Sequence, residues 1–245
     1  MKLTLYHFFP KQLNMFGDRG NIIVFKKRCE WRGIELEVVE IRDCQNIDMS
    51  KADLIYIGGG PDSLFVPCTE QLALIKDELK AAIDDGVSVL AVSSGYQFFG
   101  THYKFSDGKE AKGLAIFDFY TEAPKKQNRR LVGNIILESE TFGTIAGFEN
   151  HLGRTYHHYE PLGKVLTGYG NNETDKKEGL RYQNFIATYI HGPLLPKNPA
   201  IADYLLEAGY KRKTGNKLPA YANDNLEKLA NERARQLFLK REPSV

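Results

Sequence analysis

Cysteines and long apolar runs are scarce in this sequence, and each shortage excludes a class of protein. The 245 residues include only three cysteines, Cys29, Cys44 and Cys68, none of them in a Cys-x-x-Cys pair. So few thiols at such spacing exclude a disulfide framework and a zinc finger, and we expect them to be reduced and without a catalytic role. No segment approaches the length of a membrane span, and Met1 to His7 lacks the apolar core of a signal peptide. We therefore expect a cytoplasmic protein with no membrane span.

An excess of charge of one sign is also lacking. Lys and Arg number 33 and Asp and Glu 31, which gives a formal net charge of +2. The two signs alternate along most of the chain, whereas a nucleic-acid binder usually has a basic face. We therefore expect no nucleic acid partner. The hydrophobic fraction of 42% is ordinary for a globular chain that buries a core.

Short apolar runs alternate with helical patterns in the first half of the chain. The clearest helical pattern is Glu70 to Ile83, in which Leu72, Ile75, Leu79 and Ile83 form one stripe. The alternation predicts an α/β fold with a doubly wound, mostly parallel sheet flanked by helices. The runs, in order, are Leu3 to Phe8, Asn21 to Trp31 (helical), Ile34 to Ile41, Leu54 to Ile57 and Val87 to Val92.

The second half contains more glycine and more β-forming residues. We expect strands at Leu114 to Tyr120, Leu131 to Glu138 and Phe185 to Ile190, with an exposed basic loop at Ala123 to Arg130. These elements complete one domain, residues 1–218. Residues 219–245 form a tail, whose helix at Asn223 to Lys240 has an apolar stripe that we expect to pack on the domain, with docking on a partner as the alternative. The stripe is Leu226, Leu229, Ala230, Ala234 and Leu237.

Ser93 occupies the position of a nucleophile at a sharp turn. The apolar strand Val89 to Val92 runs directly into Ser93-Ser94-Gly95-Tyr96-Gln97, a small-residue turn followed by a short helix. A strand-to-helix turn of this kind lifts one side chain clear of the sheet, and amides at the helix start can stabilise an oxyanion. An ordinary βα turn also needs small residues, so this run by itself leaves both interpretations open.

Two further runs strengthen the catalytic interpretation. Gly58-Gly59-Gly60 follows a strand and offers bare backbone amides for an oxyanion, although a plain tight turn has the same composition. No lysine with serine or threonine follows it, as a phosphate-binding loop requires. His191 ends the β-rich run Ala187 to Ile190 and is followed at once by a turn, where an imidazole can serve as a general base.

In combination, these runs resemble the class I glutamine amidotransferases of the cobyric acid synthase type. The triple glycine, the elbow at Ser93, Gly147 to Thr155 and Thr188 to Gly192 occur in the family's order. The resemblance implies the flavodoxin-like amidotransferase fold and the hydrolysis of L-glutamine to glutamate and ammonia, without a metal or an organic cofactor.

Within the family, the chain is most similar to the glutaminase subunits of lipid II isoglutaminyl synthases. The runs that carry this likeness are Tyr6-His7-Phe8, Gly17-Asp18-Arg19-Gly20-Asn21, Phe117-Asp118-Phe119-Tyr120 and Gly168-Tyr169-Gly170-Asn171-Asn172. The likeness implies a heterodimer with a Mur-ligase-like, ATP-dependent synthetase, which amidates D-glutamate of the peptidoglycan stem peptide. The alternatives are an amidotransferase for a corrinoid synthetase and a non-catalytic scaffold subunit.

The resemblance also implies roles for individual residues. Carried over by position, the nucleophile falls on Ser93, the general base on His191, and the glutamine-binding arginine on Arg130, with Arg129 as its adjacent rival. Glutamine-site residues and a possible orienting residue complete the set: Gly59 and the Ser94 amide in the oxyanion hole, Gln97 beside the site, and Glu149 as the possible partner of His191.

Two departures from the family pattern bear on activity. The family's nucleophile is a cysteine, and the hydroxyl of Ser93 is a much weaker nucleophile, so we expect this chain to bind glutamine but to turn it over poorly. A deliberate replacement that traps the substrate complex and a naturally inactive subunit both explain the serine. In addition, His191-Gly192-Pro193 lacks the glutamate of the His-x-Glu run found in many class I enzymes.

Overall fold

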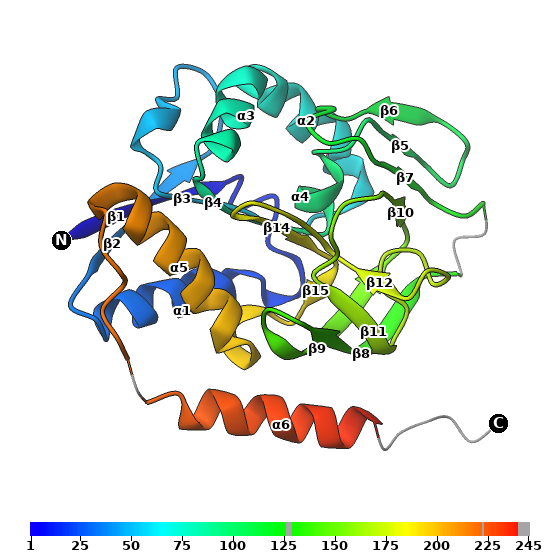
Figure 1. Ribbon diagram of the computed structural model, residues 1–245. Helices are drawn as coiled ribbons and strands as arrows, with labels where there is room; N and C mark the ends of the chain where they lie inside the picture. Colours follow the sequence, from blue (N-terminus) through cyan, green and yellow to red (C-terminus); the bar gives the residue numbers. More distant parts are fainter. Residues whose placement is uncertain (126–128, 222, 240–245) are drawn as a thin grey trace.

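A six-stranded sheet forms the centre of the protein, which we describe from a computed structural model over residues 1–125, 129–221 and 223–239. Its strand order is β13-β14-β4-β3-β1-β2 (Figure 1). Five strands are parallel and β13 pairs with β14 in the antiparallel sense, so the predicted mostly parallel sheet is confirmed. The strands are β1 (Lys2–Phe8), β2 (Glu35–Ile41), β3 (Leu54–Ile57), β4 (Ser88–Val92), β13 (Leu180–Tyr182) and β14 (Phe185–Thr188).

Helices cover both faces of this sheet (Figure 1). Alternate side chains of a strand point to opposite faces, and in β1 Leu3 and Leu5 join one core cluster while Tyr6 and Phe8 join the other. The first cluster includes residues of α1 (Arg19–Glu30) and α5 (Pro199–Thr214). The second includes residues of α2 (Phe65–Ala73) and α3 (Lys76–Asp84). Because both faces are buried, the central strands read as continuous apolar runs.

The helix predicted at Glu70 to Ile83 is two helices, and this prediction is therefore wrong in its continuity. α2 ends at Ala73 and α3 begins at Lys76, with Ile75 between them at φ −124°. The predicted stripe still packs, because all four of its residues are buried in the same cluster. Leu74 is exposed at the break, so the interruption lets the chain change direction without losing the apolar contact of Ile75.

Two smaller sheets lie beside the main sheet (Figure 1). One has the order β10-β7-β5-β6 and the other β12-β11-β8-β9-β15. The first comprises β5 (His102–Lys104), β6 (Glu110–Lys112), β7 (Tyr120–Glu122) and β10 (Arg154–Tyr156). The second comprises β8 (Leu131–Ser139), β9 (Gly143–His151), β11 (Gly163–Thr167), β12 (Lys177–Glu178) and β15 (Ile190–His191).

Two of the strands predicted from the sequence differ from the strands that the structure shows. The strand expected at Leu114 to Tyr120 is wrong, because the amides of residues 114–117 bond to carbonyls of residues 98–100 and only Tyr120 belongs to a strand. The strand expected at Phe185 to Ile190 is broken at Tyr189, where the chain leaves the main sheet and enters β15. Part of the expected basic loop, residues 126–128, lies outside the described residues.

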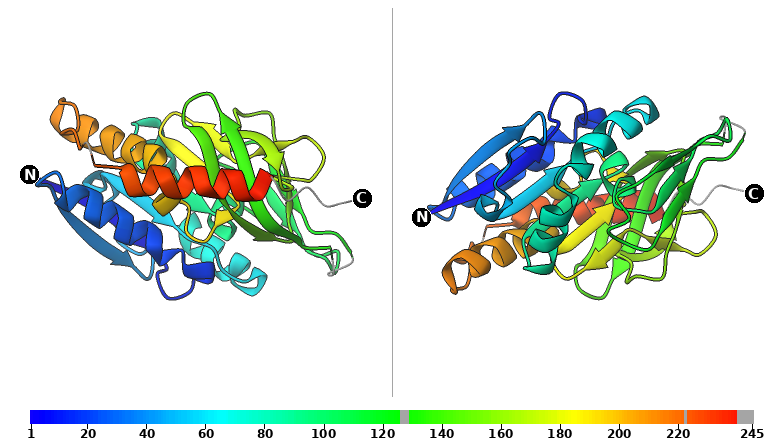
Figure 2. Two further views of the ribbon diagram at one scale, coloured as in Figure 1. Left: turned by 90° about the horizontal axis from the view of Figure 1, so that it is seen from below. Right: turned by 90° about the horizontal axis from the view of Figure 1, so that it is seen from above.

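The tail forms α6 (Asn225–Leu239), which lies across β8 and β9 (Figure 2). Ala234 packs on Ile136 and Ala146, with Phe238 beside them. Ala234 belongs to the predicted apolar stripe, but the three leucines of the stripe are between 54% and 79% exposed, so the stripe packs on the domain only in part. Lys240, the expected end of the helix, lies outside the described residues. Among the helices of the described ranges, none has the length and apolar character needed to cross a membrane.

The remaining helical elements are short. Four 3-10 turns are η1 (Met15–Gly17), η2 (Met49–Lys51), η3 (Asp62–Leu64) and η4 (Leu195–Lys197), and α4 (Ser94–Gln97) follows β4 directly. η1 and α4 follow the carboxyl ends of β1 and β4, and these ends share one edge of the parallel sheet, where ligands bind in open α/β folds. η4 follows β15, which belongs to the second smaller sheet.

Candidate active site

Ser93 sits in a strained turn between β4 and α4. Its backbone has φ 55° and ψ −111°, a conformation that a residue with a side chain rarely adopts. The turn is braced on both sides: the Ser93 amide donates to the Thr188 carbonyl at 2.8 Å, and the Gly95 amide donates to the Gly58 carbonyl at 3.2 Å. A Cβ on Gly95 would lie 2.4 Å from the Ile57 carbonyl oxygen, so only glycine permits this approach. These are the features of the elbow expected from the sequence.

Gly59 brings the two expected catalytic side chains together. A Cβ built on Gly59 would lie 2.9 Å from Ser93 Cβ and 2.9 Å from His191 Cε1. The hydroxyl of Ser93 and the imidazole of His191 therefore flank the same point, although they come from distant parts of the chain. The break of the second-half strand at Tyr189 has a function here, because it directs His191 in β15 to this edge.

Asp18 is the partner of His191, and the sequence reasoning missed it. His191 Nδ1 lies 3.1 and 3.2 Å from the two carboxylate oxygens of Asp18, and both side chains are fully buried. A carboxylate can only accept a hydrogen bond, so Nδ1 carries the hydrogen and Nε2 keeps the lone pair that a base needs. Within the described residues, Nε2 has no hydrogen-bond partner. The run Gly17 to Asn21 contained the signal, since it places an acid at the start of the first long helix, after the first strand.

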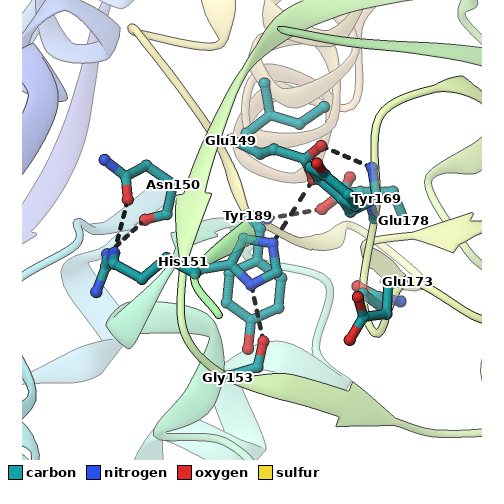
Figure 3. Close-up of polar contacts among 12 residues, drawn as sticks. Glu149, Asn150, His151, Gly153, Tyr169, Glu173, Glu178 and Tyr189 are labelled. Atoms are coloured by element: carbon teal, nitrogen blue, oxygen red, sulfur yellow. Dashed lines mark hydrogen bonds and ion pairs between the residues drawn. The ribbon is translucent and has the colours of Figure 1, made fainter. Parts of the chain in front are cut away.

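Glu149 lies elsewhere and does not contact His191. Its carboxylate accepts the amides of Tyr169 at 2.7 Å and Gly170 at 3.0 Å and lies 3.6 Å from His151 Nε2 (Figure 3). In the antiparallel pair β9–β15, Glu149 is opposite Ile190, the neighbour of His191. Cross-strand partners share a face and sequence neighbours do not, so Glu149 and His191 point to opposite faces. The orienting contact that we expected of Glu149 is made by Asp18.

The backbone amides near the elbow differ in whether they already donate a hydrogen bond within the protein. The Gly59 amide donates to Asp18 Oδ2 at 3.3 Å, and the Gly60 amide to Ser94 Oγ, also at 3.3 Å. Ser94 Oγ in turn donates to the Gly60 carbonyl at 2.7 Å, so the triple-glycine loop is fastened to the elbow. The Ser94 amide opens α4, where the first N–H groups of a helix lack a partner within the helix. The Ser94 amide is therefore available to a ligand, whereas the Gly59 amide is already bonded to Asp18.

A cavity of about 490 Å³ opens in front of these residues. Arg130 lines it and donates to the side-chain and backbone oxygens of Asn150 at 2.9 and 3.0 Å. Its rival, Arg129, is not among the lining residues and pairs with Glu173 at 3.5 Å. The structure thus directs Arg130 toward the cavity and Arg129 away from it.

Gln97 and His151 form part of the cavity wall. Gln97 Nε2 donates to the Tyr189 hydroxyl at 3.1 Å, so this side chain both borders the cavity and holds the elbow against β14 and β15. The His151 ring stacks on Tyr189 with ring centres 3.9 Å apart (Figure 3). Nδ1 of His151 lies 2.8 Å from the Gly153 carbonyl, and burial lowers the pKa of the imidazole. Contacts with the protein therefore fix the orientation of both side chains.

No cysteine of the chain can replace Ser93 as the nucleophile. Burial raises the pKa of Cys29 and Cys44 to about 12 and that of Cys68 to about 11. At neutral pH these thiols stay protonated, and the thiolate is the reactive form. None of them is among the described residues that line the cavity.

Comparison with known families identifies this architecture. Residues 4–199 match the CobB/CobQ-like glutamine amidotransferase domain. The chain belongs to this family. The match covers the elbow, the triple-glycine loop and His191, which are the parts of the amidotransferase that we built from the residues.

Curated relatives and solved structures agree with this assignment. The amidotransferase is 50% identical over 212 residues to the lipid II isoglutaminyl synthase (glutamine-hydrolyzing) subunit GatD of Staphylococcus aureus, with 86% of each chain covered. It is 34% identical to the Streptococcus pneumoniae subunit of the same name, over 94% of this chain and 90% of that one. Cobyric acid synthase of Bacteroides fragilis is 27% identical, over 75% of this chain and 37% of that protein. The predicted resemblance is confirmed.

Two solved structures share the fold at low sequence identity. A glutamine amidotransferase has a TM-score of 0.58 at 16% identity, and PurLQS from Thermotoga maritima has 0.56 at 14%. Each comparison covers 84% of this chain and 98% of the other. The predicted amidotransferase fold class is therefore confirmed.

Proposed function

We propose that this amidotransferase is a glutaminase subunit in which position 93 carries the nucleophile and His191 is the general base. The observation that carries the proposal is the arrangement at Gly59. A strained elbow presents Ser93 to an imidazole whose other nitrogen is held by a buried carboxylate, Asp18. This is the geometry of nucleophile, base and orienting acid required for acyl transfer.

The reaction follows from this order of groups, described here with a cysteine at position 93. His191 Nε2 takes the thiol proton, and the thiolate attacks the carboxamide carbon of glutamine. The resulting oxyanion is stabilised by the Ser94 amide. His191 returns the proton to the leaving nitrogen, and ammonia departs from a glutamyl thioester. Water then attacks the thioester, again with His191 as base, and releases glutamate.

Arg130 supplies the binding contact for the substrate. Arg130 lines the same cavity as the elbow residues Ser93 and Ser94, and its guanidinium is held by Asn150. A guanidinium matches a carboxylate in a two-point hydrogen bond, so Arg130 would bind the α-carboxylate of glutamine while the carboxamide reaches position 93. Gln97 and His151 would form the wall between these two contacts.

The comparisons favour peptidoglycan synthesis as the pathway that uses the ammonia. The two GatD relatives match along nearly their whole length, whereas the chain spans only about a third of the cobyric acid synthase. We infer a heterodimer with a Mur-ligase-like synthetase that uses ATP and ammonia to amidate D-glutamate of the lipid II stem peptide. Ammonia is protonated in water, so we also expect a shielded path between the two subunits.

Ser93 makes this chain a poor catalyst in the proposed reaction. A serine hydroxyl is far less acidic than a thiol, so His191 generates little of its anion near neutral pH. Binding does not depend on that anion, so we expect glutamine to be held without being consumed. Calorimetry on the chain should detect glutamine binding, and a pure scaffold should show none.

Restoring the nucleophile tests the proposal directly. Ser93→Cys should raise glutamate release from L-glutamine well above that of the unchanged chain, because the thiolate is the stronger nucleophile. Ser93→Ala is the matched control and should stay at the background rate. If Ser93→Cys releases no more glutamate than Ser93→Ala, either alone or with the partner that copurifies, the proposed function fails.

A further inference from the structure

Two buried side chains outside the cavity, Tyr56 and Asn21, connect the loop that carries Asp18 to the segment that follows His191. Tyr56 lies in the middle of the main sheet and is fully buried, and Asn21 is in the first turn of α1 and equally buried. Neither touches the substrate cavity. Their hydrogen bonds nevertheless reach the loop of Asp18 at one end and the segment after His191 at the other.

The direction of each hydrogen bond follows from the chemistry of its groups. The Leu195 amide can only donate, and it lies 3.0 Å from Asn21 Oδ1. This contact orients the side-chain amide, so Asn21 Nδ2 donates to the Tyr56 oxygen at 3.2 Å. The Tyr56 hydroxyl hydrogen must then go to its other neighbour, the Asp18 carbonyl, at 3.1 Å.

The connection forms a closed ring. Leu195 is in η4, which follows His191 after a short turn, and Asp18 returns to His191 through its carboxylate. Burial raises the pKa of Tyr56 well above its usual value, so its hydroxyl stays a donor at every physiological pH. The backbone amide of Asn21 also donates to the Asp18 carbonyl, at 2.9 Å, which satisfies both lone pairs of that oxygen. A ring with every member bonded resists displacement of Asp18.

Close packing at Gly20 supports the same alignment. A Cβ on Gly20 would lie 2.3 Å from Pro193 Cγ, so the Asp18 loop and the turn after His191 touch at this point. The run Gly17-Asp18-Arg19-Gly20-Asn21 thus supplies the acid, the gap for Pro193 and the amide that reaches Tyr56.

We propose that Tyr56 and Asn21 are positioning residues that hold Asp18 at the hydrogen-bonding distance His191 needs to act as the base. This inference rests on the proposed function, since it assigns the ring to the same base. It goes further because it makes reactivity at position 93 depend on the Tyr56 hydroxyl, which does not line the cavity.

The test measures thiol reactivity in the Ser93→Cys background. Iodoacetamide alkylates a thiolate with loss of iodide, and the three native cysteines are buried with a raised pKa, so the rate reports position 93. Tyr56→Phe removes only the hydroxyl and should slow alkylation about threefold to tenfold at neutral pH, while glutamine affinity stays unchanged. Asn21→Ala should act in the same direction if Tyr56→Phe folds poorly.

Tyr6→Phe is the matched control. The Tyr6 hydroxyl also donates to a backbone carbonyl, that of Asp48, at 2.9 Å, but it is not connected to His191. Its removal should leave the alkylation rate unchanged. Adding Asp18→Asn should abolish the further effect of Tyr56→Phe, because the ring acts through Asp18.

Two results would overturn the inference. One is equal alkylation in Tyr56→Phe and Tyr6→Phe, and the other is a Tyr56→Phe effect that persists in full with Asp18→Asn, which indicates general loosening. The proposed function fails separately, through absent glutamate release by Ser93→Cys, whatever the alkylation rates show.

Discussion

The edge of the main sheet around His191 and the C-terminal helix α6 are held to the protein in opposite ways. At the edge, the side chains of Asp18 and His191 are fully buried and each is bonded to the next. In α6, contact is confined to a narrow face around Asn231 and Ala234, and Leu226, Leu229 and Leu237 are exposed. The first region tolerates little change, and the second should tolerate a great deal.

The comparison teaches what an apolar pattern can and cannot predict. In α3 the apolar stripe is the buried face, whereas in α6 one small residue of the stripe, Ala234, makes the contact together with the side-chain amide of Asn231, and the stripe's leucines do not. Ala234 allows close approach to β8 and β9, and Asn231 Nδ2 donates to the Thr144 and Lys197 carbonyls at 3.0 and 2.9 Å. Burial therefore follows the surface that is available, and helical spacing alone does not select it.

The largest effect should come from the buried edge. In the Ser93→Cys background, His191→Ala should lower the rate of glutamate release by about 10²- to 10⁴-fold, since the general base is lost. Arg129→Ala is the control, because its side chain points away from the cavity, and its rate should be unchanged. An active His191→Ala variant would show that another group serves as the base.

Glu178 should make the stability of the buried region depend on pH. Burial raises its pKa to about 8 from an ordinary 4.5. The folded chain then binds a proton that the unfolded chain has released between these values, so stability should fall as pH rises from about 4.5 to 8. The free energy of unfolding, measured with urea, should fall across that range by an amount on the order of a few kcal/mol. Glu178→Gln should remove this fall. If the free energy of unfolding of the variant falls with pH as steeply as that of the unchanged chain, Glu178 is not the source of the pH dependence.

Gly59 tests how tightly the edge is packed. Gly59→Ala should destabilise the chain by about 1 to 3 kcal/mol and displace Ser93 or His191, because its Cβ would lie 2.9 Å from each. Gly133→Ala in β8 is the control, since no atom lies within 4 Å of its Cβ position. Urea unfolding compares the two, and equal stability would contradict close packing around Gly59.

The smallest effects should be found in α6, and they should differ by face. Asn231→Ala should cost about 1 to 2 kcal/mol, because the partly buried carbonyls of Thr144 and Lys197 lose their donor. Leu229→Ser, on the exposed side, should change stability by less than about 0.5 kcal/mol in the isolated chain. Thermal unfolding of both variants is sufficient, and a larger loss for Leu229→Ser would reverse our assignment of the packed face.

Much of the fold was predictable because its signals are local. The apolar runs of β1, β3 and β4 are buried on both faces and read the same way in any context, and the small residues after Val92 indicate a tight turn wherever they occur. The exceptions are also physical. Residues 114–119 have a strand-like composition, but part of this segment bonds to the chain after the elbow instead of to a strand.

By itself, the sequence determined the alternation of strands and helices, the elbow at Ser93 and the family to which the chain belongs. Only the tertiary structure decided that Asp18, and not Glu149, faces His191, since the pairing of β15 with β9 places Glu149 opposite Ile190 and on the other face from His191. It also decided which face of α6 packs. Contacts between distant segments depend on register and on approach distance, and neither quantity is written in the local order of residues.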